Sequence, residues 1–121
     1  MDDFKRTIKN IMAETAQLKD ATTNQVVVDT ASWLAEYLTE IEDMINTRIM
    51  CECEEFNITV DEIDPYMIEA YEAVDIALTS VDNLEMSFAF DIDYTDYVET
   101  VVYDVEFALE KISYIERRMH I

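Results

Sequence analysis

Residues 23–47, with the sequence TNQVVVDTASWLAEYLTEIEDMINT, carry the clearest structural signal in the chain. Apolar residues recur there in alternating steps of four and three, which places them on one face of an α-helix. This face comprises Val27, Ala31, Leu34, Leu38, Ile41 and Ile45, and it is widened by Trp33, Tyr37 and Met44. Thr22 or Thr23 can serve as the N-cap, because a threonine hydroxyl accepts a hydrogen bond from the first turn. The stretch therefore predicts an amphipathic helix over 23–47, and the pattern allows it to continue to about Cys53.

The same apolar spacing recurs on both sides of this helix. It predicts further helices over residues 2–18, 65–82 and 95–119. The second of these has a strong start at Asp64-Pro65, where a capping carboxylate is followed by proline at the first helical position. We therefore expect a mainly α fold in which residues 1–121 form a single domain, a bundle of about four helices.

Two segments have patterns that also fit short β-strands. Near 56–60, apolar residues occupy every second position, and the same alternation extends over 84–94. A helix through Leu84, Phe88 and Ile92 fits the second segment equally well. Glycine is absent from the chain, which favours helices because the tight turns of β-hairpins commonly need positive φ. Both alternatives stay open for these segments.

The composition predicts a folded protein without covalent cross-links. Half of the 121 residues are apolar, and aromatic residues make up 11%, whereas disordered acidic segments are poor in such residues. Cys51 and Cys53 are too close to form a disulfide framework, which favours a reducing, cytoplasmic setting. The sequence has neither a signal-peptide pattern nor an apolar run of the roughly 18 residues that span a bilayer, so we expect no membrane association.

Net charge is the strongest functional signal. The chain has 28 acidic and 8 basic residues, a formal charge of −20. From Ile49 through Glu110 there are 18 acidic residues and no lysine or arginine. Such a surface repels nucleic acid, whose binding depends on neutralising phosphates with basic side chains, and attracts basic proteins. We therefore exclude direct nucleic-acid binding and expect a basic protein as the partner.

No constellation of catalytic, cofactor-binding or metal-binding residues stands out, so we expect that the protein is not an enzyme. The only histidine, His120, is next to the last residue, where chains usually fray. Asp91, Asp93 and Thr95 imitate the first ligand positions of an EF-hand loop, but the glycine and the final glutamate of that motif are missing. The Cys51-x-Cys53 pair has no second pair of ligands to complete a zinc site.

Carboxylates recur at helical spacing in several rows, of which Glu36, Glu40 and Asp43 form one. Residues three or four apart on a helix lie about 5–6 Å from each other, a separation comparable to that of successive phosphates on a DNA strand. The predicted partner-binding residues lie in the last two helices and the segment between them: Glu69, Glu72, Asp75, Asp82, Glu85, Asp91, Asp93, Asp96, Glu99, Glu106 and Glu110. Aromatic residues off the apolar stripes could add stacking contacts: Tyr66, Tyr97, Tyr103 and Tyr114.

In size, acidity and expected helix content, the chain resembles the DNA-mimicking inhibitors encoded by phages, which include anti-restriction and anti-CRISPR proteins and uracil-DNA glycosylase inhibitors. The resemblance covers the whole chain and involves no shared motif. It implies a partner that is a nuclease or another basic nucleic-acid-binding protein, located in the host cytoplasm. The alternative is a helical interaction or assembly protein, such as a homodimer, whose acidity only keeps it in solution.

Overall fold

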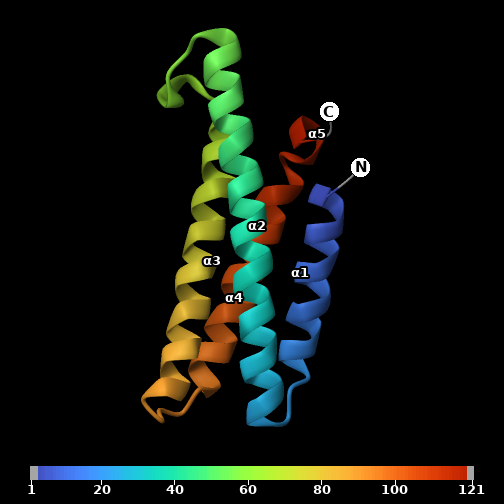
Figure 1. The fold of residues 1–121 in the computed structure, drawn as a ribbon, viewed down its shortest axis with the longest axis vertical. Helices are drawn as coiled ribbons and strands as arrows, with labels where there is room; N and C mark the ends of the chain where they lie inside the picture. The colour runs from blue at the N-terminus through green and yellow to red at the C-terminus, as the bar shows by residue number, and fades with distance from the viewer. Residues whose placement is uncertain (1–2, 120–121) are drawn as a thin grey trace.

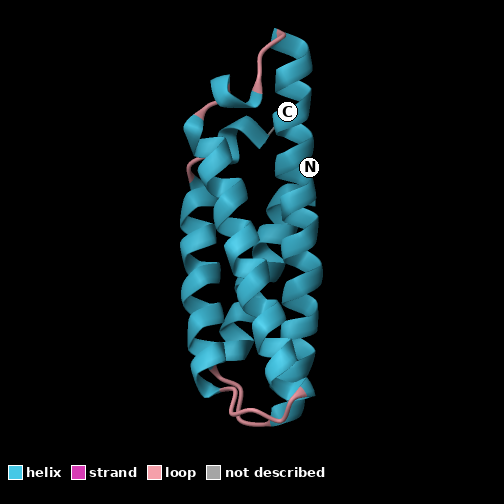
Figure 2. Ribbon diagram, turned by 90° about the vertical axis from the view of Figure 1, so that its left-hand side faces the viewer, coloured by secondary structure: helices cyan, strands magenta, loops and turns pink. Residues whose placement is uncertain are grey.

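The computed structural model describes residues 3–119, and all regular structure in this range is helical (Figures 1 and 2). The four long helices are α1 (Asp3–Lys19), α2 (Asn24–Phe56), α3 (Pro65–Ala89) and α4 (Thr95–Ser113). A single 3-10 turn, η1 (Val60–Glu62), lies between α2 and α3, and a one-turn helix, α5 (Glu116–Met119), follows α4. The predicted helical bundle is confirmed. The expectation for His120 concerns a residue outside the described range.

The helices run alternately up and down, and each packs against its neighbours in the sequence (Figure 1). α4 also contacts α1, so α1 and α3 are diagonal to each other across the bundle. α2 has 33 residues and α1 has 17, which correspond to lengths of about 50 Å and about 25 Å. The hairpin of α2 and α3 therefore projects well beyond the start of α1 (Figure 1).

The predicted apolar stripes form the core. All six stripe residues of α2 are buried, together with Met67, Val74 and Val81 of α3 and Val101, Val105 and Ile112 of α4. The expected widening of the α2 stripe is only partly confirmed. Tyr37 and Met44 pack against the core, whereas Trp33 is 48% exposed and stacks on Tyr37 instead. An exposed aromatic side chain thus remains on the surface of α2.

The helix starts follow the predicted caps. The Thr23 hydroxyl accepts a hydrogen bond from the Val26 backbone N–H at 3.3 Å, which caps α2. The Asp64 carboxylate accepts one from the Tyr66 N–H at 3.0 Å, and Pro65 follows it as the first residue of α3. Both start positions are therefore determined by short-range interactions that the sequence reveals.

The helix ends show how the chain manages without glycine. Asn57 (φ 53°) and Asp91 (φ 55°) adopt the left-handed conformation just after α2 and just after the C-cap of α3. At the end of α3, the Ile92 N–H donates back to the Ser87 carbonyl at 2.8 Å, and an equivalent bond of 3.0 Å closes α2. This hydrogen-bond pattern is the Schellman motif, in which the residue with positive φ is usually glycine. Asn and Asp can replace glycine because they tolerate positive φ better than most residues.

The β alternatives are wrong within the described residues. Over 84–94, α3 continues to Ala89 and the remaining residues form the joint to α4. Leu84 is buried and Phe88 packs against the core at helical spacing, while Met86 is 53% exposed. The apparent alternation therefore arose from apolar side chains that a helix leaves on its surface, not from a half-buried strand.

The segment 56–60 is divided between two other elements. Phe56 is the last residue of α2, and Val60 is the first residue of η1. Two other predicted boundaries also move: α2 runs nine residues beyond 47 and three beyond Cys53, to which the pattern allowed it to continue, and α3 runs seven residues beyond 82. The last helix ends earlier than predicted, at Ser113, and resumes as α5 at Glu116.

Candidate acidic interaction surface

Acidic charge is concentrated on the hairpin of α2 and α3. Residues 24–89 contain sixteen acidic side chains and one basic side chain, Arg48, a net charge of −15. The segment Asp3–Lys19, which forms α1, contains four basic and two acidic residues. Because α1 and α3 are diagonal in the bundle, the charge is strongly polarised across it. The negative charge of the described structure is therefore concentrated on the α2–α3 hairpin and not on α1.

The structure places all eleven predicted partner-binding residues on the surface. Five belong to α3, namely Glu69, Glu72, Asp75, Asp82 and Glu85. Asp91 and Asp93 lie in the joint between α3 and α4, and the remaining four, Asp96, Glu99, Glu106 and Glu110, belong to α4. The prediction of exposed carboxylates is thus correct, but these residues do not form one continuous face.

The five carboxylates of α3 cover the outer side of that helix. Asp75 and Asp82 are seven residues apart and so lie in one row, and Asp75 approaches α2 closely enough to act on Glu42. Glu69 lies on the other side, where its carboxylate is 3.8 Å from Lys111 of α4. The other four carboxylates form no ion pair among residues 3–119, and α3 itself contains no basic residue.

Two predicted residues of α4 face a different direction. Glu106 forms a 2.5 Å ion pair with Lys19 at the end of α1. Glu99 lines the same shallow groove between α1 and α4, together with Tyr103. These carboxylates therefore lie on the side of the bundle where α1 contributes positive charge, away from the row on α3.

The two joint residues have local structural roles. Asp91 ends α3 in the left-handed conformation, and the Asp93 carboxylate accepts hydrogen bonds from the Thr95 N–H and hydroxyl at 3.0 and 2.9 Å. These bonds lower the pKa of Asp93, because they stabilise its charged form. The resemblance of this segment to a calcium loop is thus explained by a turn that starts α4.

A second row of carboxylates, on α2, was not included in the predicted surface. Its exposed members are Asp29, Glu36, Glu40, Asp43 and Glu54. Their spacings of seven, four, three and eleven residues keep them on one side of the helix. The sequence shows the row from Glu36 to Asp43, but only the packing of α2 beside α3 shows that the two rows belong to one hairpin.

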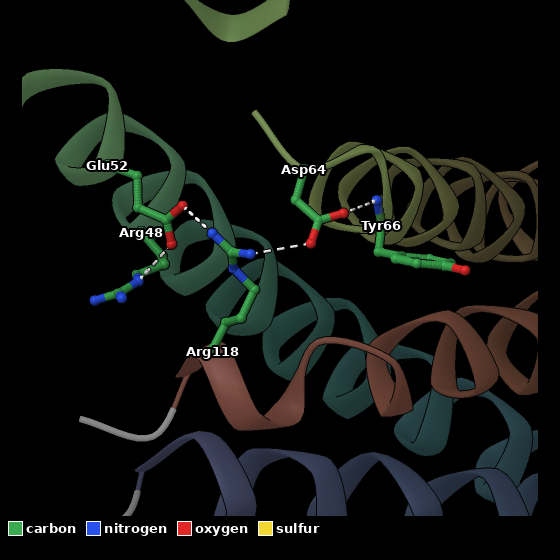
Figure 3. Close-up of polar contacts among 5 residues, drawn as sticks. All are labelled: Arg48, Glu52, Asp64, Tyr66 and Arg118. Atoms are coloured by element: carbon green, nitrogen blue, oxygen red, sulfur yellow. Dashed lines mark hydrogen bonds and ion pairs between the residues drawn. The ribbon is translucent and has the colours of Figure 1, made fainter. Parts of the chain in front are cut away.

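Arg48 of α2 and Arg118 of α5 both form ion pairs with carboxylates near the end of α2 (Figure 3). Glu52 of α2 is buried, and its two carboxylate oxygens bind Arg48 Nε at 2.9 Å and Arg118 Nη2 at 2.6 Å. Arg118 also donates through Nη1 to the Asp64 carboxylate at 3.0 Å. We call these four residues the Glu52 network. The network joins α5 to the hairpin. Because Arg48 is bound to Glu52, it does not neutralise the exposed carboxylates of α2 and α3.

Two carboxylates, Glu42 of α2 and Asp75 of α3, lie close together where these helices pack against each other. Burial, and next the adjacent Asp75 carboxylate, raise the pKa of Glu42. Its Oε2 atom is buried and has no hydrogen-bond partner within residues 3–119. In the same direction, burial raises the pKa of Glu14, and burial with the nearby Asp82 raises that of Glu85. Burial thus favours the neutral form of all three carboxyl groups, and neighbouring acidic residues add to this at Glu42 and Glu85.

We predict that Glu42→Gln increases the free energy of unfolding at pH 7 by about 1 kcal/mol. The amide removes the negative charge and can donate a hydrogen bond to Asp75. Because the pKa of Glu42 is higher in the folded protein than in the unfolded chain, protonation of Glu42 favours folding, and its contribution to stability should increase as the pH falls towards the glutamate range. Urea denaturation across this pH range would show a weaker increase for Glu42→Gln. Glu40→Gln, an exposed change on the same helix, is the control, and an equal gain from it would refute the role of Glu42.

Within the described range, no helix combines the length and apolar character that a bilayer-spanning segment requires. Among residues 3–119, no three His, Cys, Asp or Glu side chains converge in a way that could hold a metal ion. Comparison of the chain with known protein families, with curated proteins and with solved structures found no match.

Proposed function

We propose that the protein is an inhibitor that binds a basic nucleic-acid-binding protein, such as a nuclease or a CRISPR or restriction effector, by presenting a DNA-like acidic surface. The observation that supports this most is the net charge of −15 on residues 24–89, where the single base is held by buried Glu52. Charge needed only for solubility would be distributed over all four helices. In this protein α1 instead has a net positive charge, so the negative charge is not distributed over all four helices.

The dimensions of the hairpin fit this role. α2, with 33 residues, is about 50 Å long, and duplex DNA of that length contains about 15 base pairs. The exposed carboxylates of α3, and those of α2 from Asp29 to Asp43, recur every three to seven residues, which is a rise of about 5–10 Å along the axis. A channel that binds successive phosphates would therefore meet negative charges at similar intervals along a rigid rod.

The chemistry of the partner follows from that of phosphate recognition. Lysine and arginine side chains that neutralise phosphates can neutralise fixed carboxylates instead, and arginine can bind a carboxylate through two parallel hydrogen bonds. The helices hold the carboxylates in place before binding, so the partner does not need to order them. Attraction between surfaces of opposite charge also accelerates association.

Affinity capture from a nuclease-containing bacterial lysate tests the proposal. We expect the immobilised protein to retain nucleic-acid-binding proteins at low ionic strength and to release them when duplex DNA is added. Raising the salt from about 50 to about 200 mM should weaken retention by about 100-fold if roughly four ion pairs form. Retention that is insensitive to salt and to DNA would contradict the proposal and favour an assembly protein that associates through apolar contacts.

A further inference from the structure

The surface between α3 and α4 differs from the rest of the acidic surface because it carries exposed apolar side chains. The antiparallel register is set by Glu69 beside Lys111 and by a hydrogen bond between the Ser80 hydroxyl and the Asp104 carboxylate. It places Ile76 of α3 level with Phe107 of α4. Ile76 is 54% exposed and Phe107 is 42% exposed, so both retain apolar surface in water.

The same surface continues towards the end of α4. The rings of Tyr66 and Tyr114 lie 5.7 Å apart across the two helices, and both residues are more than half exposed. Tyr114 donates a hydrogen bond to Glu110 at 3.3 Å. We call the surface formed by Tyr66, Glu69, Ile76, Phe107, Glu110 and Tyr114 the α3–α4 face.

One cation already occupies this face and shows how it accommodates others. The Lys111 ammonium lies 5.2 Å from the Phe107 ring centre, 5.9 Å from the Tyr114 ring centre and 3.8 Å from the Glu69 carboxylate. A cation over an aromatic ring is attracted by the ring's negative face, and arginine makes such contacts more often than lysine. On this face, one positively charged side chain can therefore contact aromatic rings and pair with a carboxylate at the same time.

We propose that the α3–α4 face binds a basic amphipathic segment of the partner protein, with its arginine or lysine side chains against the rings and carboxylates and its apolar side chains over Ile76 and Phe107. This inference rests on the proposed function and specifies the partner surface. A bare polycation would leave the apolar side chains exposed to water. A second copy of the chain fits less well, because symmetric pairing would bring Glu69 and Glu110 towards the same carboxylates of the other copy.

Two synthetic peptides of equal length and charge test this inference. One carries leucine and lysine at amphipathic helical spacing, and the other has serine in place of each leucine. We expect the leucine–lysine peptide to bind the full chain about tenfold more tightly than the serine–lysine peptide, because it also buries apolar surface. The affinities would be measured by fluorescence titration at about 50 mM and about 200 mM salt.

A double substitution, Ile76→Ser with Phe107→Ser, should reduce the affinity for the leucine–lysine peptide to that for the serine–lysine peptide. The matched control is Met12→Ser with Trp33→Ser, which removes an aliphatic and an aromatic side chain of similar exposure, 56% and 48%, from α1 and α2. The control should keep the tenfold difference. Circular dichroism melting curves of both variants would verify that each is folded.

The outcomes separate this inference from the proposed function. If both peptides bind equally at low salt and the double substitution changes neither affinity, the α3–α4 face has no such role, while the proposed function stands. If neither peptide binds, both proposals fail. A wild-type dimer in light scattering that Ile76→Ser with Phe107→Ser converts to a monomer would assign the face to a second copy and overturn the inference.

Discussion

Replacing Glu72, Asp75, Asp82 and Glu85 by their amides is expected to weaken binding to a captured nucleic-acid-binding partner by about 100-fold at low salt. All four carboxylates are exposed on α3, a helix without a basic residue. In the proposed complex each would form an ion pair, and the loss of one such contact costs about threefold in affinity at low ionic strength. Titration of the purified partner with both proteins at one fixed ionic strength would measure the effect.

A second fourfold variant provides the control for this prediction. Glu14, Asp20, Glu99 and Glu106 are acidic residues on the side of α1 or on the side of α4 that faces it. Their amides change the net charge by the same amount, so long-range attraction decreases equally in both variants. We expect the control to weaken binding by no more than about threefold. Equal weakening by both sets would show that net charge, and not the row on α3, determines binding.

Arg118→Met is expected to lower the free energy of unfolding by about 2 kcal/mol, the contribution of charge-assisted hydrogen bonds to a buried carboxylate. The change removes the bonds from Arg118 to Glu52 and Asp64. Glu52 is buried and would keep only Arg48 as a partner. Because Arg118 is 40% exposed, the loss should be smaller than for a fully buried pair. The midpoint of thermal unfolding should fall by about 8 °C.

The adjacent residue provides the control for Arg118. Arg117 is exposed and forms no ion pair with any residue in the described range. Arg117→Met also removes one positive charge, and we expect it to change the free energy of unfolding by less than about 0.5 kcal/mol. Urea denaturation of both variants, followed by circular dichroism, would measure the difference. An equal loss for the two variants would show that the Glu52 network does not stabilise the attachment of α5.

The helices could be predicted from the sequence because two independent signals agree. The apolar spacing of residues 23–47 defines a buried face, and Thr23 provides the cap at its start. At Asp64 and Pro65, the cap and the proline likewise determine the first residue of α3. Such local signals involve only neighbouring residues, so they can be recognised without knowledge of the tertiary structure.

The ends of α2, α3 and α4 were predicted poorly because their signals are weaker in this chain. Asn57 and Asp91 stand where glycine would normally reveal the end of a helix. The segment 84–94 resembled a strand because Met86 of α3 and Phe90, the residue that follows α3, are apolar but exposed, which a pattern of buried residues does not anticipate. The break at Tyr114 after α4, followed by α5, has no signal in the apolar spacing, which continues to Met119.

The acidic character of the candidate site could be predicted, but its geometry could not. The absence of basic residues from α3 is visible in the sequence. The pairing of Glu106 with Lys19 joins residues 87 positions apart, so only the folded structure shows that this carboxylate faces α1. For the same reason, the sequence does not reveal that the carboxylates of α2 lie on a helix packed beside α3. Nor does it reveal that Lys111 lies near the rings of Phe107 and Tyr114.

Competition with DNA tests the central claim most directly. A partner isolated by capture would be loaded with a fluorescent DNA duplex and titrated with the protein at low salt, and fluorescence anisotropy would follow the bound DNA. If the carboxylates of α2 and α3 occupy the channel that binds DNA, the duplex is displaced completely, and the inhibition constant equals the dissociation constant of the protein for the partner. A partner that binds the protein and the duplex at the same time, with unchanged affinity for each, would contradict DNA mimicry.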